Sequence, residues 1–243
     1  MNHKVLIFDI EGTVCPITFV KDVLFPYFTG QIPQILSAYK YPLTGNVDTD
    51  HDPILDTLLK FPQDTLTSQE TLRSHILQLV AADIKEPVLK SLQGIVWKKG
   101  YQCGDLKAPV YADAIELITK FTQQPNQKVY IYSSGSIAAQ KLLFGHVEDV
   151  GDMNQFISGY FDITTAGFKT ETSSYTTILK EIFGDGEEEE EESVLFLSDN
   201  VKEVKAAKEA GMEGYVVERP GNAPLTDSDR RNFTIINTFE DMV

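Results

Sequence analysis

Short apolar runs rich in β-branched residues alternate with longer amphipathic patterns at the start of the chain and again through its second half. The short runs are typical of buried strands, whereas the longer patterns repeat apolar residues every three or four positions and indicate helices. The expected strands are residues 4–9, 128–132, 161–165, 194–198 and 215–217, with a weaker one at 233–236. The expected helices between them are residues 112–121, 137–144, 173–183 and 201–210.

This alternation predicts the fold class. Strands that alternate with helices form βαβ units, which give a mostly parallel sheet with helices on both faces and right-handed crossovers. Gly211 stands just after the last strong helical pattern, where a helix C-terminus favours glycine. We therefore expect an α/β protein with a Rossmann-like, doubly wound parallel sheet.

The stretch between the first strand and about residue 105 has a different pattern. Apolar residues recur at helical spacing throughout it, and it has no strand signal of comparable strength. Thr67 and Glu70 are spaced as a capping box, Pro87 suits a first helical turn, and Gly100 is expected to end the last helix. The expected division is a core made of residues 1–14 and 106–243, with an inserted helical domain made of residues 15–105.

Composition and charge narrow the class of partner. The chain has 243 residues and is 42% hydrophobic, which is enough for a sizeable core. Its net charge of −15 argues against nucleic acid and against an anionic membrane. The acidic run at residues 187–192 is expected to be a solvated, mobile loop because like charges repel. With neither a long apolar segment nor a signal peptide pattern, we expect a soluble intracellular protein.

The cysteines and histidines do not indicate a metal or disulfide framework. Cys15 and Cys103 are far apart and form no CxxC pair, and the four histidines show no HExxH spacing. Zinc chemistry and a disulfide-stabilised fold are therefore not expected.

Polar side chains follow four of the expected strands. In open parallel sheets, ligands bind at the carboxyl ends of the strands, so these side chains are expected to share one cleft. Taken singly, each has an ordinary explanation as a turn former, a helix cap or a solvated lysine. The residues are Asp9 and Glu11 after the first strand, Ser133 and Ser134 after the second, Lys169 after the third, and Asp199 with Glu203 after the fourth.

Together these groups suit phosphoryl transfer. Two or three carboxylates can hold a Mg²⁺ ion, which prefers oxygen ligands and keeps several waters. A serine hydroxyl, N–H groups at a helix start and a lysine can neutralise the remaining phosphate oxygens. One carboxylate can attack phosphorus to form an aspartyl-phosphate, while a second protonates the leaving oxygen and later activates water. The cation and the lysine would also make one positive pocket in an acidic protein.

The order of these motifs resembles a known superfamily. "DIEGT", "YSSGS", Lys169 and "FLSDN" resemble, in sequence order, the four motifs of the haloacid dehalogenase superfamily of phosphohydrolases, in which a helical cap is inserted after the first motif. "WKKGYQCGDL", "GFKTETSSY" and "ERPGNAPL" are similar, more closely, to the enolase-phosphatase family of methionine salvage. The resemblance extends from Val5 to about Leu225.

The resemblance implies a reaction and a set of roles. The family uses Mg²⁺ to enolise 2,3-diketo-5-methylthiopentyl 1-phosphate and then removes its phosphate to give an acireductone. It implies that Asp9 and Glu11 are catalytic, that Ser133, Ser134 and Lys169 bind substrate, and that Asp9, Glu11 and Asp199 bind the metal. Glu11 replaces the aspartate that is common in the superfamily, and whether it gives the metal its carbonyl or its carboxylate is open, as is the role of Glu203. The expected partner is a small phosphorylated metabolite, and neither nucleic acid nor a membrane is expected. We expect a monomer in the cytoplasm, and a further location in the nucleus stays open.

Three other functions stay open at this point. A general Mg²⁺-dependent phosphatase with a cap would carry the same motifs but would not enolise. A phospho-accepting signalling module also places acids and a lysine at strand ends, but it needs no helical insertion. A dehalogenase uses the attacking aspartate without Mg²⁺, and the acids at Glu11 and Asp199 favour the metal.

Overall fold

The computed structural model describes residues 3–44, 52–82, 84, 86–184 and 193–242. The chain divides into two compact units. The core unit comprises Met1–Phe19 and Lys107–Val243, and the helical unit comprises Val20–Leu106. Residues 15–19, which the sequence assigned to the insertion, thus belong to the core unit. The acidic run predicted to be a mobile loop lies outside the described residues.

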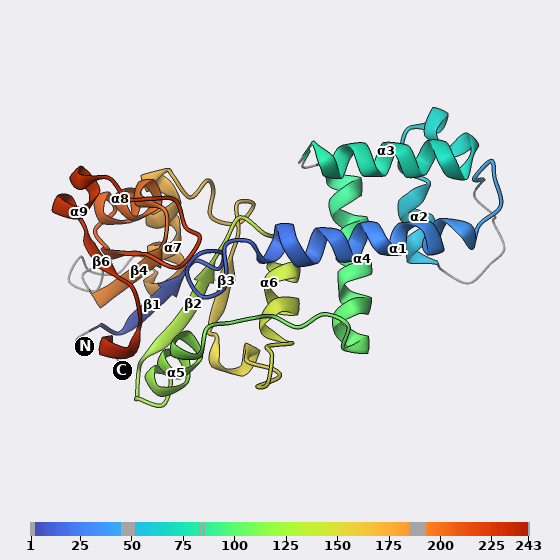
Figure 1. Ribbon diagram of the computed structural model, residues 1–243. Coiled ribbons are helices and arrows are strands. Elements are labelled where there is room, and N and C mark those ends of the chain that lie inside the picture. Colours follow the sequence, from blue (N-terminus) through green and yellow to red (C-terminus); the bar gives the residue numbers. More distant parts are fainter. Residues whose placement is uncertain (1–2, 45–51, 83, 85, 185–192, 243) are drawn as a thin grey trace. The chain divides into compact units, whose positions relative to one another are not determined.

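The core unit is built on a six-stranded sheet in which every neighbouring pair is parallel (Figure 1). The strand order is β3-β2-β1-β4-β5-β6, so the chain winds outward from β1 in one direction and then in the other. This order confirms the predicted doubly wound α/β fold. The strands are β1 (Val5–Phe8), β2 (Lys128–Tyr132), β3 (Gly159–Phe161), β4 (Val194–Ser198), β5 (Glu213–Val217) and β6 (Thr234–Ile236).

β1 is fully buried because it lies between β2 and β4 and both of its faces are covered. Successive side chains of a strand point to opposite faces. Val5 and Ile7 accordingly join an apolar cluster with residues of α7 (Thr172–Phe183) and α8 (Val201–Glu209). Phe8 contacts Phe239 edge to face, with ring centroids 5.6 Å apart. The apolar run of the first strand therefore holds the start of the following turn rigidly at the sheet's carboxyl edge.

The helices of the core unit follow the predicted pattern closely. Besides α7 and α8, they are α5 (Ala112–Phe121), α6 (Ile137–Phe144) and α9 (Asp227–Asn232). The predicted end of α8 is confirmed, because Gly211 takes the left-handed conformation just after it (φ 99°).

The predicted strand over residues 161–165 is wrong in position, because β3 ends at Phe161. The carboxylate of Asp162 accepts hydrogen bonds from the backbone N–H groups of Thr164 (2.9 Å) and Thr165 (3.1 Å). An aspartate that bonds the backbone ahead of it forms a turn and competes with strand pairing. The β-branched residues there belong to a turn.

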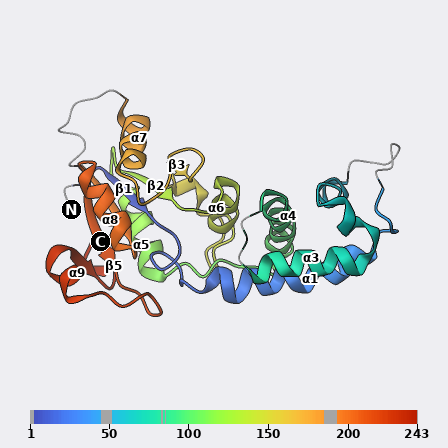
Figure 2. The ribbon, with the colours of Figure 1, turned by 90° about the horizontal axis from the view of Figure 1, so that it is seen from above.

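The helical unit contains no strand among its described residues and has its own apolar core. α1 and α3 run alongside each other within it (Figure 2). Fully buried residues such as Phe28, Leu58, Leu72 and Leu92 come from all four helices and fill that core. The helices are α1 (Phe25–Ser37), α2 (Pro53–Leu58), α3 (Gln69–Ala81) and α4 (Pro87–Cys103).

Two details of the helical unit differ from the prediction. The cap of α3 is Ser68, which forms a capping box with Thr71, so the predicted pair Thr67 and Glu70 is shifted by one residue. α4 begins at Pro87 as predicted, but it continues past Gly100 and ends at Gly104 in the left-handed conformation (φ 82°). Gly100 is needed for another reason, because a Cβ there would lie 2.7 Å from the ring of Tyr27.

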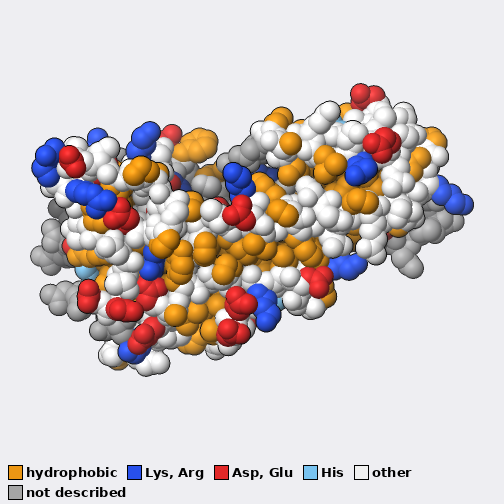
Figure 3. Space-filling view, in the orientation of Figure 1, with side chains coloured by type: hydrophobic (Ala, Val, Ile, Leu, Met, Phe, Trp, Pro, Cys, Tyr) orange, Lys and Arg blue, Asp and Glu red, His pale blue; other side chains and the backbone are white. Residues whose placement is uncertain are grey.

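Acidic and basic side chains are interspersed over the visible face of the core unit (Figure 3). Cys15 is buried, Cys103 is exposed, and neither forms a disulfide. None of the helices among the described residues is long and apolar enough to cross a membrane.

Candidate active site

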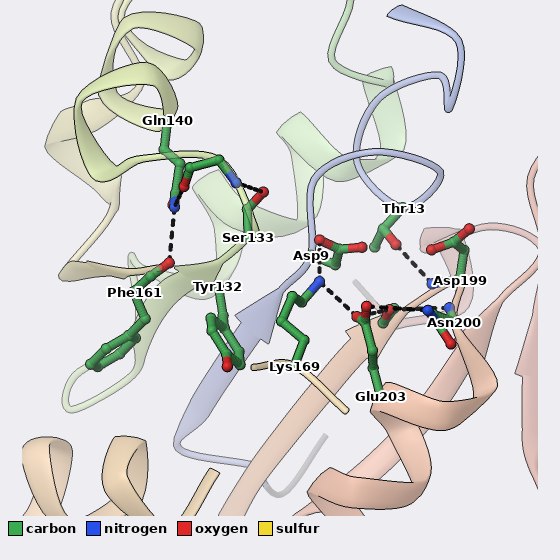
Figure 4. A network of polar contacts seen from close by, with 12 residues as sticks. Asp9, Thr13, Tyr132, Ser133, Gln140, Phe161, Lys169, Asp199, Asn200 and Glu203 are labelled. Atoms are coloured by element: carbon green, nitrogen blue, oxygen red, sulfur yellow. Dashed lines mark hydrogen bonds and ion pairs between the residues drawn. The ribbon is translucent and has the colours of Figure 1, made fainter. Parts of the chain in front are cut away.

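Four of the predicted site residues, Asp9, Ser133, Lys169 and Asp199, gather at the carboxyl edge of the sheet (Figure 4). β1, β2 and β4 are adjacent strands, and Asp9, Ser133 and Asp199 each come directly after one of them. Lys169 comes from the loop that leads from β3 to α7. The arrangement follows from strand order, since parallel neighbours end at the same edge.

Lys169 lies between two carboxylates. Its Nζ is 2.5 Å from Oδ1 of Asp9 and 2.6 Å from Oε2 of Glu203, and its side chain is only 5% exposed. Burial acts to lower the pKa of Lys169, but the charges of Asp9 and Glu203 outweigh burial and raise it. Lys169 is therefore a buried ammonium group held between two carboxylates, and not the solvated lysine that its sequence context alone would suggest.

Glu203 is held in place by the end of β4. Its Oε2 accepts a hydrogen bond from Ser198 Oγ (2.8 Å), and its Oε1 accepts one from Asn200 Nδ2 (3.3 Å). Burial raises the pKa of Glu203, and the charge of Lys169 opposes this increase. The residue whose role the sequence left open thus orients the lysine.

The loop that carries Lys169 is fixed by side-chain hydroxyl groups. Three consecutive backbone carbonyls of this loop each accept a hydrogen bond from a hydroxyl group on β2 or α7. The pairs are Tyr132 Oη to Gly167 O (2.8 Å), Ser174 Oγ to Phe168 O (2.8 Å) and Tyr175 Oη to Lys169 O (2.7 Å). Both tyrosines are fully buried. Sequence reasoning missed these donors, although Tyr132 precedes Ser133 and Tyr175 ends the "GFKTETSSY" motif.

Asp199 lies on the other side of the network from Ser133 (Figure 4). Its backbone N–H donates to Thr13 Oγ1 (3.0 Å), which joins the turn after β1 to the end of β4. Burial, followed by repulsion from Asp9 and Glu203, raises the pKa of Asp199 to about 7. Asp199 is not the N-cap of α8, because Asn200 accepts the bond from Lys202 N. The charge of Lys169 opposes the increase in the Asp199 pKa only in part, so negative charge dominates around this carboxylate.

The turn after β1 is tied to the rest of the core unit through its carbonyls. The carbonyls of three consecutive residues accept bonds from Asn222 Nδ2, Arg219 Nε and the backbone N–H of Tyr111. The acceptors are Gly12 O (2.8 Å), Thr13 O (3.2 Å) and Val14 O (2.8 Å), respectively. Arg219 and Asn222 come from the "ERPGNAPL" motif, to which the sequence assigned no role. Gly12 has φ 75°, which favours glycine.

The second predicted motif forms a loop at the start of α6. Ser133 is buried and its Oγ accepts a bond from Gly135 N (3.3 Å), whereas Ser134 is exposed. Neither serine caps α6, since Ser136 accepts the bond from Ala139 N. Gln140, another residue that sequence reasoning missed, is buried and its Nε2 donates to Gly135 O (2.8 Å) and Phe161 O (2.9 Å). The loop is thus held from beneath, with Ser134 on its accessible side.

Glu11 lies in the turn after β1, two residues beyond Asp9, and is partly exposed. Its backbone pairs with Cys15. Burial raises the pKa of the Cys15 thiol, and the charges of Glu11 and Asp9 raise it further. Cys15 is therefore a protonated, inert thiol next to this acidic turn.

The carboxylates at the strand ends meet the modest requirements of a Mg²⁺ site. In the part of the chain that the structure describes, no group of three or more His, Cys, Asp or Glu side chains is arranged to hold a metal ion. Mg²⁺ does not need such a group, because it keeps several waters and often takes one or two protein carboxylates plus substrate phosphate. Asp9 and Asp199 follow adjacent strands, and the negative charge of Asp9 raises the pKa of Asp199. A bound cation would offset this repulsion, so the two carboxylates fit this smaller requirement.

Comparison with known proteins agrees with this geometry. Residues 3–211 match the model of a family described as haloacid dehalogenase-like hydrolases. The chain is 54% identical to Enolase-phosphatase E1 of Debaryomyces hansenii, over 98% of this chain and 96% of the relative. It is also 54% identical to Enolase-phosphatase E1 of Scheffersomyces stipitis, over the whole of both chains. The crystal structure of the UTR4 protein of Saccharomyces cerevisiae superposes with a TM-score of 0.81 at 46% identity, covering 98% of this chain and 99% of that one. The chain is a haloacid dehalogenase-like hydrolase and belongs to the enolase-phosphatase E1 family.

Proposed function

We propose that this enzyme is the Mg²⁺-dependent enolase-phosphatase of methionine salvage. It would convert 2,3-diketo-5-methylthiopentyl 1-phosphate into the acireductone and inorganic phosphate. The observation that carries the proposal is the buried contact of Lys169 with Asp9 and Glu203, beside Asp199 and at the ends of adjacent strands. Membership of the enolase-phosphatase family supports the choice of substrate.

In the phosphatase half-reaction, Asp9 is the nucleophile. A carboxylate oxygen of Asp9 forms a bond to phosphorus while the bond between phosphorus and the ester oxygen breaks. Glu11 donates a proton to the departing oxygen and then removes a proton from water. That water attacks the aspartyl-phosphate, which releases inorganic phosphate and restores Asp9.

Lys169 and the loop at the start of α6 bind the phosphate. The ammonium group of Lys169, which contacts Asp9 directly, neutralises phosphate oxygens as they approach the nucleophile. Ser133 and Ser134 contribute hydroxyl groups, and the N–H groups at the start of α6 add a favourable dipole. Glu203 keeps the lysine aimed at Asp9 during this exchange of partners.

Asp9 and Asp199 would hold Mg²⁺, with Glu11 as the third protein ligand. We favour its backbone carbonyl as that ligand, because a cluster of three carboxylate side chains is not found among the described residues. When bound, the ion polarises a substrate carbonyl for enolisation and offsets the charge on the phosphate. The longer Glu11 side chain is then left for proton transfer, including transfer from carbon.

We assign the helical unit, Val20–Leu106, as the cap domain that excludes water and selects the thioether tail. Several aromatic residues in and next to this unit have structural contacts of their own. Phe25 stacks on Trp97 with centroids 6.3 Å apart, Trp97 Nε1 donates to Leu24 O (2.9 Å), and Tyr27 donates to Asp105. Phe19 is buried in the core unit. Packing is therefore part of the role of each of these residues.

The test is to incubate the enzyme with the diketone phosphate and Mg²⁺ and to follow enol absorbance and free phosphate together. We expect both signals from the native enzyme and neither phosphate release nor an acyl-phosphate from Asp9→Asn. Asp227→Asn, on the exposed helix α9, is the matched control and should be fully active. Phosphate release from simple esters with no enol signal would replace this proposal by a general capped phosphatase.

A further inference from the structure

The orientation of the Asn222 side-chain amide is set by two carbonyl groups. Its Nδ2 donates to Gly12 O (2.8 Å) and to Val217 O (3.2 Å). Both partners are acceptors, so the reverse orientation of the amide would place three oxygens against one another and lose both bonds. Asn222 Oδ1 is therefore held facing away from these carbonyls.

That oxygen lies beside the carboxylate of Asp199. A Cβ built on Gly12 would be 2.8 Å from Asn222 Oδ1 and 2.7 Å from Asp199 Oδ2, so both oxygens border the same small volume next to Gly12. Gly12 keeps this volume open, since any other residue would collide with both groups. Asn222 Oδ1 is buried and has no hydrogen-bond partner among the described atoms.

Two acceptors beside one another are an unfavourable arrangement unless a donor or a cation joins them. A buried acceptor without a partner costs its full desolvation free energy, so native structures rarely retain one without a reason. Arg219, the nearby cation in the same motif, is already committed to Thr13 O, Asn237 O and Asp113. A water bound to a cation at Asp199 would join the two acceptors, because its oxygen would bind the cation and its proton would be donated to Asn222 Oδ1. Such water is a strong donor because the metal withdraws electron density from it.

We propose that Asn222 is a positioning residue for the Mg²⁺ site: its Oδ1 accepts a hydrogen bond from metal-bound water while its Nδ2 holds the Gly12 turn. This inference rests on the proposed function only in that both require Mg²⁺ at Asp9 and Asp199. It gives Asn222, the asparagine of "ERPGNAPL", a role in the affinity of the site for Mg²⁺. Residues that hydrogen-bond to a metal ligand typically change metal affinity by about 10- to 100-fold when they are mutated.

The experiment measures Mg²⁺ binding to the free enzyme by calorimetry, without substrate. Asn222→Ala should weaken Mg²⁺ binding by about tenfold or more. Asn222→Asp keeps an oxygen at the position of Oδ1, adds a negative charge and loses the donor to Gly12 O. It should bind Mg²⁺ at least tenfold more tightly than Asn222→Ala. The matched control is Asn154→Ala, because Asn154 Nδ2 likewise donates to a backbone carbonyl, Lys141 O (3.1 Å), and its other side-chain bonds go to Asp152 and Tyr160. Its Mg²⁺ affinity should equal that of the native enzyme.

Two results would overturn the inference. Native Mg²⁺ affinity in Asn222→Ala would show that Oδ1 does not serve the metal. Equal weakening in Asn222→Asp and Asn222→Ala would show that only the bond to Gly12 matters. If Asn222→Ala does not fold, the Mg²⁺ affinity of Asn222→Asp is compared with that of the native enzyme instead. A tenfold loss of affinity in Asn222→Asp would contradict the proposed role. Because substrate is absent, failure to turn over the diketone phosphate would refute the proposed function and leave this result intact.

Discussion

Lys169 Nζ lies 2.5 Å from Asp9 Oδ1, so the phosphate-binding lysine and the nucleophile of the proposed mechanism are in contact before any substrate arrives. Both residues belong to the core unit, and Glu203 completes the contact from α8. A buried charged group held this way is maintained by its partners, since removing one leaves the others uncompensated. Preorganisation of this kind removes the need to reorder the site when phosphate binds.

Replacing Lys169 by methionine is expected to abolish phosphatase activity and to destabilise the fold at neutral pH. Asp9 and Glu203 would be left buried without their cation, at a cost of about 3–5 kcal/mol. Urea unfolding at pH 7.5 measures this loss. Lys120→Met is the control, because Lys120 forms an exposed pair with Glu116 (2.6 Å) that contributes less than about 1 kcal/mol. Equal stability of the two variants would contradict the assignment.

Tyr175→Phe should disturb Lys169 without touching the substrate. The variant removes only the hydroxyl that donates to Lys169 O, and it leaves a buried carbonyl unpaired at a cost of about 1–3 kcal/mol. We expect a higher KM and weaker inhibition by inorganic phosphate, with a smaller change in kcat. Steady-state kinetics with phosphate as inhibitor tests this. Tyr160→Phe, which loses a bond to Asn154 (2.6 Å) away from the site, should leave both constants unchanged.

The raised pKa of Asp199 predicts that the stability of the metal-free protein depends on pH. Its pKa is raised in the fold to about 7 from 3.8, so between about pH 4 and 7 the folded state binds more protons than the unfolded state. The free energy of unfolding contributed by this group should therefore be greatest below pH 4 and fall as the pH rises to 7. Denaturant unfolding in EDTA across this range measures the slope. The raised pKa of Glu203 acts in the same direction, so Asp199→Asn should reduce the slope and not remove it. An identical slope in the variant would refute the prediction.

Arg219→Lys should weaken the turn that carries Asp9 although it keeps the charge. The guanidinium donates to Thr13 O, Asn237 O and Asp113, and it lies between the rings of Tyr111 and Phe239 at 4.5 and 4.6 Å. A lysine cannot satisfy these partners in one plane, so we expect a loss of about 1–3 kcal/mol and a reduced kcat.

The control for that variant is Arg230→Lys. Arg230 pairs with Glu218 (2.6 Å) at an exposed position on α9, and its replacement should change neither stability nor rate measurably. Thermal unfolding and initial rates of the two variants, measured side by side, decide whether the burial of Arg219 matters.

Local sequence patterns predicted the strands and helices of the core unit well. Apolar β-branched runs mark β1, β2 and β4 because buried parallel strands need such side chains on both faces. The same patterns misplaced β3 and the end of α4, where a single side chain or a later glycine decided the boundary. At β3 the deciding group is the Asp162 carboxylate, and at α4 it is Gly104.

The sequence by itself determined the doubly wound sheet, the helical insertion and the order of polar groups at the strand ends. These features depend on residues close together in the chain. Only the tertiary structure decided which of those groups meet, namely that Lys169 joins Asp9 to Glu203 and that Asn222 and Arg219 hold the turn after β1. The last two contacts join residues more than 200 positions apart. No local pattern encodes such pairs, because they arise when the strand order brings the loop after β5 back to the loop after β1.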